Sequence, residues 1–384
     1  MKNSILILCL LLSVLSCSRK TEINSDAYKL VETDTHLSFP LDDRTIIYTY
    51  SLQAFTDADG KEYLVFQHEN YREILFYDMQ TQQFIKKISC EREGAEAVRR
   101  FSGFYVRNMN EIYVTHASHD GISVIDGEGK LIRYFENKTK EGEIIDTYVA
   151  VTLLLIREFD SKLYIPLGIN WKAGSEVRLQ KSNLCATIDL TNGDIHALPL
   201  SYFDVLGKED ENMITMNHTT CTNGTNFVYS FNEDENIYVT DLSHTKGRKI
   251  KVKSKYLPTV TFQPQKFTSD GSGICEDINK ARYLSLIYDP YRNVYYRIAH
   301  LKTELENGAD CLELMGFGGI AFSVIILNED FQIIGETRLP DYHYNPRLFF
   351  VREDGLYISE SHFMNPDFDE NKLCFRRLEL TKNK

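Results

Sequence analysis

Histidines recur near the ends of strand-like segments, and their type and spacing make them the first candidates for binding chemistry. His68, His300 and His362 each follow a strand tyrosine by five residues, and His116 follows another by three. Imidazole binds metal ions and, when protonated, acidic ligands. If the strands converge on one axis, these four side chains line the same opening of the central axis. Histidine is also tolerated at solvent-exposed strand ends. Direct contact with a ligand and a purely structural role therefore both stay open.

A metal site would need carboxylates or cysteines at a ligand-like spacing from these histidines. No such spacing accompanies them. We therefore expect neither a metal nor a cofactor, and we keep the four histidines as candidate ligand-binding residues.

Two aromatic residues outside the strand-like runs suggest a second kind of chemistry. Trp171, the single tryptophan, and Tyr344 lie in loop segments, where an amphipathic ring can stack on a sugar. Most of the 23 Tyr and 22 Phe lie in strand-like runs and are expected in the core. Trp171 could equally pack within its own loop. Both residues are candidate ligand-binding residues.

The composition limits the class of protein that positions these side chains. The chain has 384 residues, of which 43% are hydrophobic and 26% charged, a balance typical of a globular protein. Its 55 acidic and 43 basic residues give a net charge of −12. This charge repels phosphate backbones, so we expect no nucleic-acid partner.

The N-terminus carries an export signal. Residues 1–16 contain a short positive segment and an apolar run too short to span a bilayer, which is typical of a signal peptide. Val14-Leu15-Ser16-Cys17 resembles the lipobox of bacterial lipoproteins, which implies acylation of Cys17 and anchoring to the cell envelope. An ordinary signal peptide cut nearby is the alternative. Residues 17–27 would form a polar tether, and the membrane leaflet stays open.

The remaining residues, 28–384, are predicted to form a single domain. It is built from a repeated unit of four strands, roughly 50 to 60 residues long. Apolar and β-branched residues alternate with polar ones in its strands. The alternation predicts strands that are half-buried between stacked sheets. The expected strands are 51–55, 62–67, 73–78 and 84–89; 102–107, 111–116, 121–126 and 131–135; 148–158, 162–167, 184–190 and 194–199; 213–220, 226–231, 236–242 and 248–253; 283–288, 293–299, 320–327 and 331–339; and 348–351, 356–359 and 373–380.

The sixth unit ends after three strands, and Leu37–Leu41 near the N-terminus can supply the fourth. Such a strand would close a ring and cover two free edges. We therefore predict an all-β fold, a six-bladed β-propeller closed by an N-terminal strand. Two β-sandwich domains are the alternative, but no linker signal separates them. We expect a monomer.

Six cysteines follow Cys17, too few and too scattered for a disulfide framework. Cys90, Cys185 and Cys374 lie in or beside strand-like runs and are expected as small buried hydrophobic residues. Cys275 and Cys311 lie in loops, where an exported location allows them to pair. The sequence leaves the pairing among Cys90, Cys185, Cys221, Cys275, Cys311 and Cys374 open.

Several segments together resemble a known family: the lipobox, residues 28–34 with 37–41, residues 59–64 and 73–78, and residues 322–327. They are similar to a family of bacterial lipoproteins known only as a domain of unknown function and regarded as six-bladed, propeller-like proteins. The resemblance covers nearly the full length and rests on scaffold residues. It implies the fold and the envelope location, and it transfers no catalytic residue.

Long loops are expected on one face of the propeller. Segments 168–183, 201–212, 254–282, 300–319 and 361–371 are all connections of the same two kinds, between the second and third strands or between blades. Binding residues concentrate on such loops. We expect a binding module for a glycan, peptide or envelope protein. A hydrolase or lyase acting on an envelope or nutrient glycan through a hidden carboxylate pair, and a purely structural role in the envelope, are the alternatives.

Overall fold

The computed structural model describes residues 24–68, 72–94, 97–117, 120–145, 147–168, 182–206, 218–260, 272–305 and 309–383. The proposed signal peptide, Cys17 and Trp171 lie outside these residues. In the described ranges, no helix is long and apolar enough to cross a membrane.

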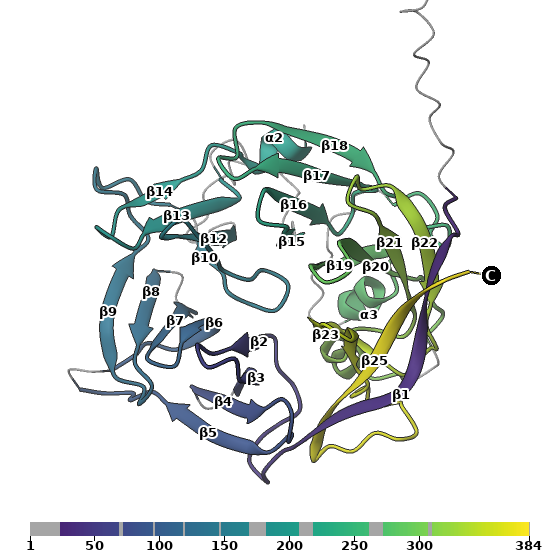
Figure 1. Cartoon of the computed structure of the whole chain (residues 1–384), viewed down its shortest axis with the longest axis horizontal. Helices are drawn as coiled ribbons and strands as arrows, with labels where there is room; N and C mark the ends of the chain where they lie inside the picture. The colour runs from purple at the N-terminus through teal and green to yellow at the C-terminus, as the bar shows by residue number, and fades with distance from the viewer. Residues whose placement is uncertain are drawn as a thin grey trace, which may run out of the picture.

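The strands in the described part of the chain form six blades around a central axis, so the fold is a six-bladed β-propeller (Figure 1). Its strand bounds agree closely with the expected ones in the first two units. Blade one contains β2 (Leu52–Thr56), β3 (Glu62–His68), β4 (Glu73–Asp78) and β5 (Phe84–Ser89), and blade two contains β6 (Phe101–Asn108), β7 (Glu111–His116), β8 (Gly121–Ile125) and β9 (Leu131–Glu136).

The later blades repeat this order, with the first strand next to the axis. The first strand of blade three is split, which the sequence did not predict. Blade three contains β10 (Thr147–Tyr148), β11 (Arg157–Phe159), β12 (Lys162–Gly168), β13 (Cys185–Asp189) and β14 (Ile195–Ala197); blade four contains β15 (His218–Thr222), β16 (Asn226–Phe231), β17 (Asn236–Asp241) and β18 (Gly247–Lys251); blade five contains β19 (Arg282–Asp289), β20 (Val294–His300), β21 (Phe322–Leu327) and β22 (Ile333–Arg338).

Blade six is closed by the N-terminal strand, as the sequence predicts. It contains β23 (Asn345–Arg352), β24 (Gly355–Ser359), β25 (Lys372–Lys382) and β1 (Tyr28–Pro40). β1 pairs antiparallel with β25 along most of its length. Near its start it also bridges β22 in parallel, at Tyr28 and Gly335. The pairing joins both ends of the chain and covers the edge of β25 (Figure 1).

The middle strands of the blades are more buried than the sequence alternation suggested. All six residues of β4 are buried, whereas most of the outer strand β5 is exposed. The reason is that hydrophobic clusters lie between successive blades and cover both faces of each sheet. One such cluster joins Phe55 of blade one to Phe104 of blade two, and another joins Val228 of blade four to Tyr295 of blade five.

Residues 149–156, here called the axial loop, separate β10 from β11 and cross the middle of the ring. Thr152 donates from its backbone amide and from its hydroxyl to the carbonyl of Tyr50, next to the inner strand of blade one. The carbonyl of Leu153 accepts from Thr220 in blade four. The side chain of Leu153 packs on the cluster between blades five and six. Because these partners lie on opposite sides of the ring, the loop fills part of the central axis.

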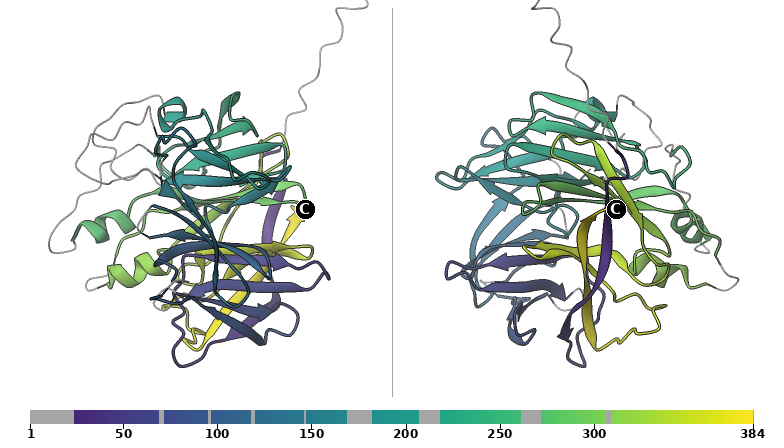
Figure 2. Two further views of the ribbon diagram at one scale, coloured as in Figure 1. Left: turned by 90° about the vertical axis from the view of Figure 1, so that its left-hand side faces the viewer. Right: turned by 45° about the vertical axis from the view of Figure 1, so that its right-hand side comes forward.

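Three short helices lie on one side of the ring, here called the loop-rich face: α2 (Tyr202–Leu206), α3 (Ser272–Ile278) and α4 (Cys311–Gly316). Figure 2 shows α3 and α4 projecting from this side, whereas the C-terminus and the start of β1 lie toward the opposite side. These helices lie in segments 201–212, 254–282 and 300–319, so three of the five long connections share one face, as the sequence predicts.

Candidate functional site

A cavity of about 420 Å³ opens on the loop-rich face between blades four and five, and we call it the blade 4–5 pocket. Its walls come from the turn between β16 and β17, the described ends of the connection from β18 to β19, and the residues that follow β20. These connections share one face in a propeller. The lining residues are Glu233, Pro258, Thr259, Val260, Glu276, Asn279, Lys280, Ala281 and Lys302.

A buried arginine fixes the turn that carries Glu233. Arg297 on β20 is 0% exposed. Its guanidinium donates to the carbonyl oxygens of Asp234 and Val252, each at 2.6 Å, and stacks 3.5 Å from the ring centre of Tyr283. Burial lowers the pKa of Arg297 to about 10, so it stays protonated at neutral pH. The bonds hold blade four against blade five at the edge of the pocket.

His300, at the end of β20, fixes another wall. Its Nδ1 lies 3.2 Å from the carbonyl oxygen of Lys280. A carbonyl only accepts, so the ring carries its proton on Nδ1. His300, a residue selected from the sequence, therefore supports the pocket through the backbone of Lys280, and direct contact of its ring with a ligand stays a prediction.

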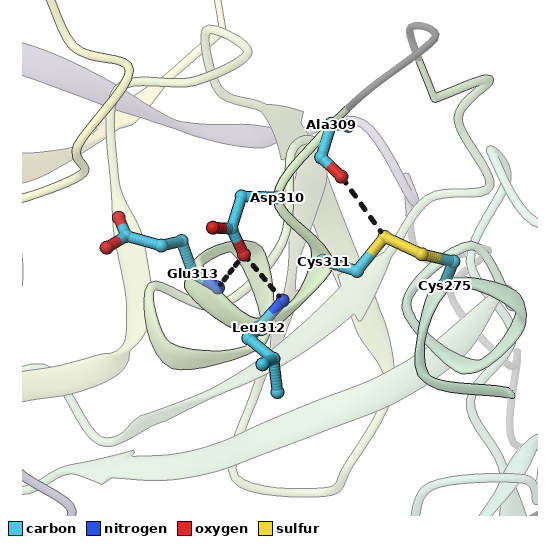
Figure 3. Close-up of a disulfide and its surroundings, with 6 residues drawn as sticks. All are labelled: Cys275, Ala309, Asp310, Cys311, Leu312 and Glu313. Carbon is cyan, nitrogen blue, oxygen red and sulfur yellow. Dashed lines mark hydrogen bonds between the residues drawn. A yellow bond between two sulfur atoms is a disulfide. The ribbon is translucent and has the colours of Figure 1, made fainter. Parts of the chain in front are cut away.

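A disulfide fixes the helix beside the pocket. Cys275 on α3 is bonded to Cys311 on α4, across 36 residues of sequence (Figure 3). Asp310 caps α4 by accepting from the backbone amides of Leu312 and Glu313, both at 3.0 Å. Cys275 directly precedes Glu276, so the bond restrains the segment that lines the cavity.

The pairing of these two loop cysteines was one possibility that the sequence left open, and the structure contains it. The thiols of Cys90 and Cys185 are buried, as expected, whereas Cys374 is only partly buried. Burial raises the pKa of the Cys90 thiol to about 12, which makes it unreactive as a thiolate at neutral pH.

The pocket carries groups of both charges. Glu233 and Glu276 supply two carboxylates, while Lys280 and Lys302 supply two ammonium groups. Apolar contact comes from Pro258, Val260 and Ala281, and none of the lining residues that the structure describes is aromatic. Over the described ranges, no group of three or more His, Cys, Asp or Glu residues could hold a metal ion.

The four candidate histidines are at most 1% exposed. His68 lies 3.3 Å from Glu73 within blade one. His116 lies within hydrogen-bond distance of Asp120 and Ser123 within blade two. Each of these two is thus held by its own blade, and direct contact with a ligand stays a prediction.

His300 and His362 both contact Gly319. His362 donates from Nε2 to the carbonyl of Gly319 at 2.7 Å. The Nε2 atom of His300 occupies the place that a Cβ atom of residue 319 would need, and the φ angle of +90° there also favours glycine. This packing holds blade five against blade six.

Tyr344 is 3% exposed and packs edge-on against Phe322, with ring centres 6.4 Å apart. Burial raises its pKa well above the usual value. Its ring lies in the core between blades five and six, so stacking on a sugar stays a prediction that this conformation does not display.

The chain can now be compared with known proteins. The model of a family described as a domain of unknown function (DUF4221) matches residues 27–338. The chain belongs to this family. The resemblance drawn from the scaffold residues is thereby confirmed. No curated protein sequence matches the chain.

Solved structures agree with this assignment. A member of the DUF4221 family from Bacteroides vulgatus ATCC 8482 is 28% identical, with a TM-score of 0.82 over 94% of this chain and 100% of that one. A candidate exported protein from Bacteroides fragilis NCTC 9343 is 11% identical, with a TM-score of 0.53 over 95% of this chain and 98% of that one. The second likeness shows the fold alone.

Sequence reasoning found the right loops but not the individual pocket residues. Segments 254–282 and 300–319, expected to carry function, contribute every lining residue except Glu233. Glu233 lies in a short turn that gave no signal. Lys280 and Lys302 have ordinary surface sequence contexts, so only their position around one cavity distinguishes them.

Proposed function

We propose that this protein is an exported, lipid-anchored binding module whose ligand site is the blade 4–5 pocket on the loop-rich face. The observation that carries the proposal is a preformed cavity whose walls are fixed by a buried arginine, a buried histidine and a disulfide. Pre-organised walls reduce the entropy cost of binding, which is a property of ligand sites.

The location of the chain ends supports the anchoring part of this proposal. β1 begins on the side opposite the loop-rich face (Figure 2). A lipid anchor at Cys17, reached through the short segment before Tyr28, would therefore leave the pocket facing away from the membrane. The disulfide between Cys275 and Cys311 is compatible with the oxidising environment of an exported protein, and the structurally similar Bacteroides fragilis protein carries a description as a candidate exported protein.

The position of the axial loop favours a ligand site away from the centre of the ring. Its contacts to blades one, four and five occupy space on the axis, where many ring-shaped proteins have room for a ligand. A site between two blades is then the accessible alternative on the loop-rich face.

The proposal is tested with a thermal-shift screen of the folded mature chain against envelope-derived saccharides, peptides and amino acids. A bound ligand raises the melting temperature by mass action. We expect a compound that stabilises the wild-type protein and the Glu128→Lys control, because Glu128 is exposed in a turn on the opposite side, but not the Glu276→Lys variant. A shift that persists in Glu276→Lys, or no shift with any compound, would overturn the proposed site.

The lipid anchor is tested separately by metabolic labelling with an alkyne fatty acid. We expect labelling and membrane association in the wild type and loss of both in Cys17→Ser. A wild-type protein that is exported, unlabelled and soluble would instead indicate an ordinary signal peptide.

A hydrolase is the second candidate because Glu233 and Glu276 line the same cavity. Glycosidases use such a pair of carboxylates as acid and base or nucleophile. Incubating the wild type and Glu276→Gln with envelope glycans, and analysing products by mass spectrometry, separates the two functions. Product formation by the wild type alone favours the enzyme.

A further inference from the structure

We propose that the blade 4–5 pocket binds a small zwitterion, a free amino acid or short peptide that carries both an ammonium and a carboxylate group. This inference rests on the proposed function and specifies its ligand class. It follows from the charges, the size and the rigidity of the pocket, and from the absence of aromatic residues among the lining residues that the structure describes.

The pocket contains complementary groups for both ends of such a ligand. The carboxylates of Glu233 and Glu276 accept hydrogen bonds from an ammonium group, and the ammonium groups of Lys280 and Lys302 donate to a carboxylate. Among the described lining residues two are acidic and two are basic, so their charges balance, although the whole chain has a net charge of −12. A ligand that is dipolar but neutral overall matches this local balance.

Asn279 adds a polar acceptor to the lining, next to Lys280 in the chain. Its side-chain oxygen is buried and accepts no hydrogen bond from any residue in the described ranges. Buried acceptors are normally satisfied. The donor groups of an amino-acid or peptide ligand, its ammonium or its amide, would satisfy this atom.

The size of the cavity favours a short ligand. About 420 Å³ lies near the lower end of the range for small-molecule sites. Pro258, Val260 and Ala281 offer an apolar surface to a short side chain. A protein partner would need a much larger contact area than this cavity provides.

The lining also argues against a sugar. Sugar rings are commonly held by stacking on aromatic side chains, and the lining residues within the described ranges include none. The sequence candidate for stacking on this face, Tyr344, has its ring in the core, and Trp171 lies outside the described residues. A charged ligand thus fits the described lining better than a neutral glycan.

Three of the four charged groups, those of Glu233, Glu276 and Lys280, sit on segments that are fixed before a ligand arrives. Arg297 fixes the turn of Glu233 by donating to the neighbouring carbonyls of Asp234 and Glu235. His300 fixes the backbone of Lys280. A disulfide at the preceding residue restrains Glu276. Holding opposite charges in place favours a ligand whose two charges have a matching separation.

The test is isothermal titration calorimetry of the mature, disulfide-bonded protein with the twenty free amino acids and a library of unmodified dipeptides. We expect at least one of these probes to bind with a Kd below about 1 mM. N-acetylation of that probe should remove its interaction with the carboxylates, and C-terminal amidation should remove its interaction with the lysines. Each change should weaken binding about tenfold or more.

Matched variants test which pocket side chain contacts the ammonium end of the probe and which contacts its carboxylate end. Lys302→Gln should weaken the unmodified probe but leave the affinity of its C-terminal amide nearly unchanged, and Glu276→Gln should do the same for its N-acetyl form. Lys249→Gln on β18 and Glu128→Gln are exposed controls and should bind like the wild type. If a pocket variant loses as much affinity for the blocked probe as for the unmodified one, the assignment of Lys302 to the carboxylate end and Glu276 to the ammonium end would be overturned.

The outcomes separate this inference from the proposed function. If no amino acid or dipeptide binds, but another compound from the thermal-shift screen binds and loses affinity in Glu276→Lys, the zwitterion inference fails while the pocket remains the site. If binding of every probe is unaffected by the pocket variants, both fail. Circular dichroism of each variant confirms that it is folded.

Discussion

The Nδ1 atom of His300 lies 3.2 Å from the carbonyl oxygen of Lys280, so a buried imidazole at the end of a blade strand fixes the backbone of a pocket residue. This contact links the core of blade five to the loop-rich face. A histidine at a strand end can therefore position a pocket residue through the backbone alone.

We predict that His300→Leu lowers the free energy of unfolding by about 1–3 kcal/mol, because the carbonyl of Lys280 loses its donor. Urea denaturation measures this change. His196 is exposed on the outer strand β14, so His196→Leu should change stability by less than about 0.5 kcal/mol. Similar effects of the two substitutions would contradict the role given to His300.

The disulfide between Cys275 and Cys311 should contribute measurably to stability. We predict that the double variant Cys275→Ser/Cys311→Ser loses about 2–4 kcal/mol of unfolding free energy, because the closed loop no longer restricts the unfolded chain. Reducing the wild type with dithiothreitol should give a similar loss, and the double variant should not respond to it. Cys374→Ser provides the control, since Cys374 is a free thiol, and a full response of the double variant to reductant would contradict the prediction.

Arg297 should be among the most sensitive positions of the chain. In Arg297→Met, several carbonyl oxygens between blades four and five lose their donor at once, so we predict a loss of at least about 3 kcal/mol. Arg297→Lys should recover only part of it, because an ammonium cannot donate in so many directions.

Arg338→Met is the matched control for this prediction. Arg338 is exposed and pairs with Asp341 on the surface, so its replacement should cost less than about 1 kcal/mol. Unfolding in urea compares the variants. Equal losses at the two arginines would show that Arg297 does not hold the blades together.

Three buried histidines should make the fold sensitive to mild acid. Burial lowers the pKa of His116, His244 and His362 from 6.5 to about 4. Because the unfolded chain then binds protons more readily than the folded one, their contribution to stability is complete above about pH 6.5 and is lost as the pH falls toward 4. The urea midpoint should decrease over this interval.

His362→Gln should make this decrease shallower, since glutamine can still donate to the carbonyl of Gly319 but does not titrate. His196→Gln, at an exposed position, should retain the wild-type slope. The measurement is a series of urea midpoints between pH 7.5 and 4.5. A slope in His362→Gln equal to that of the wild type would exclude His362 as a source of the acid sensitivity.

The sequence by itself determined the repeating framework of this protein. Strand segments such as Glu73–Asp78 were recognisable because a short run of apolar and β-branched residues ends in Asp before a polar turn. The missing strand of the sixth unit pointed to Leu37–Leu41 because an incomplete blade leaves an exposed edge. These are local signals, or simple counts of local signals, so they can be recognised without knowledge of the fold.

Tertiary structure decided the features that depend on which blades lie together. The middle strands are covered on both faces because each blade packs between two others, and the axial loop interrupts the first strand of blade three because its contacts lie in other blades. The pocket is assembled from Glu233, Glu276 and Lys302, which belong to three separate connections. No local pattern encodes their proximity, since it arises only when blades four and five are held side by side by contacts such as those of Arg297.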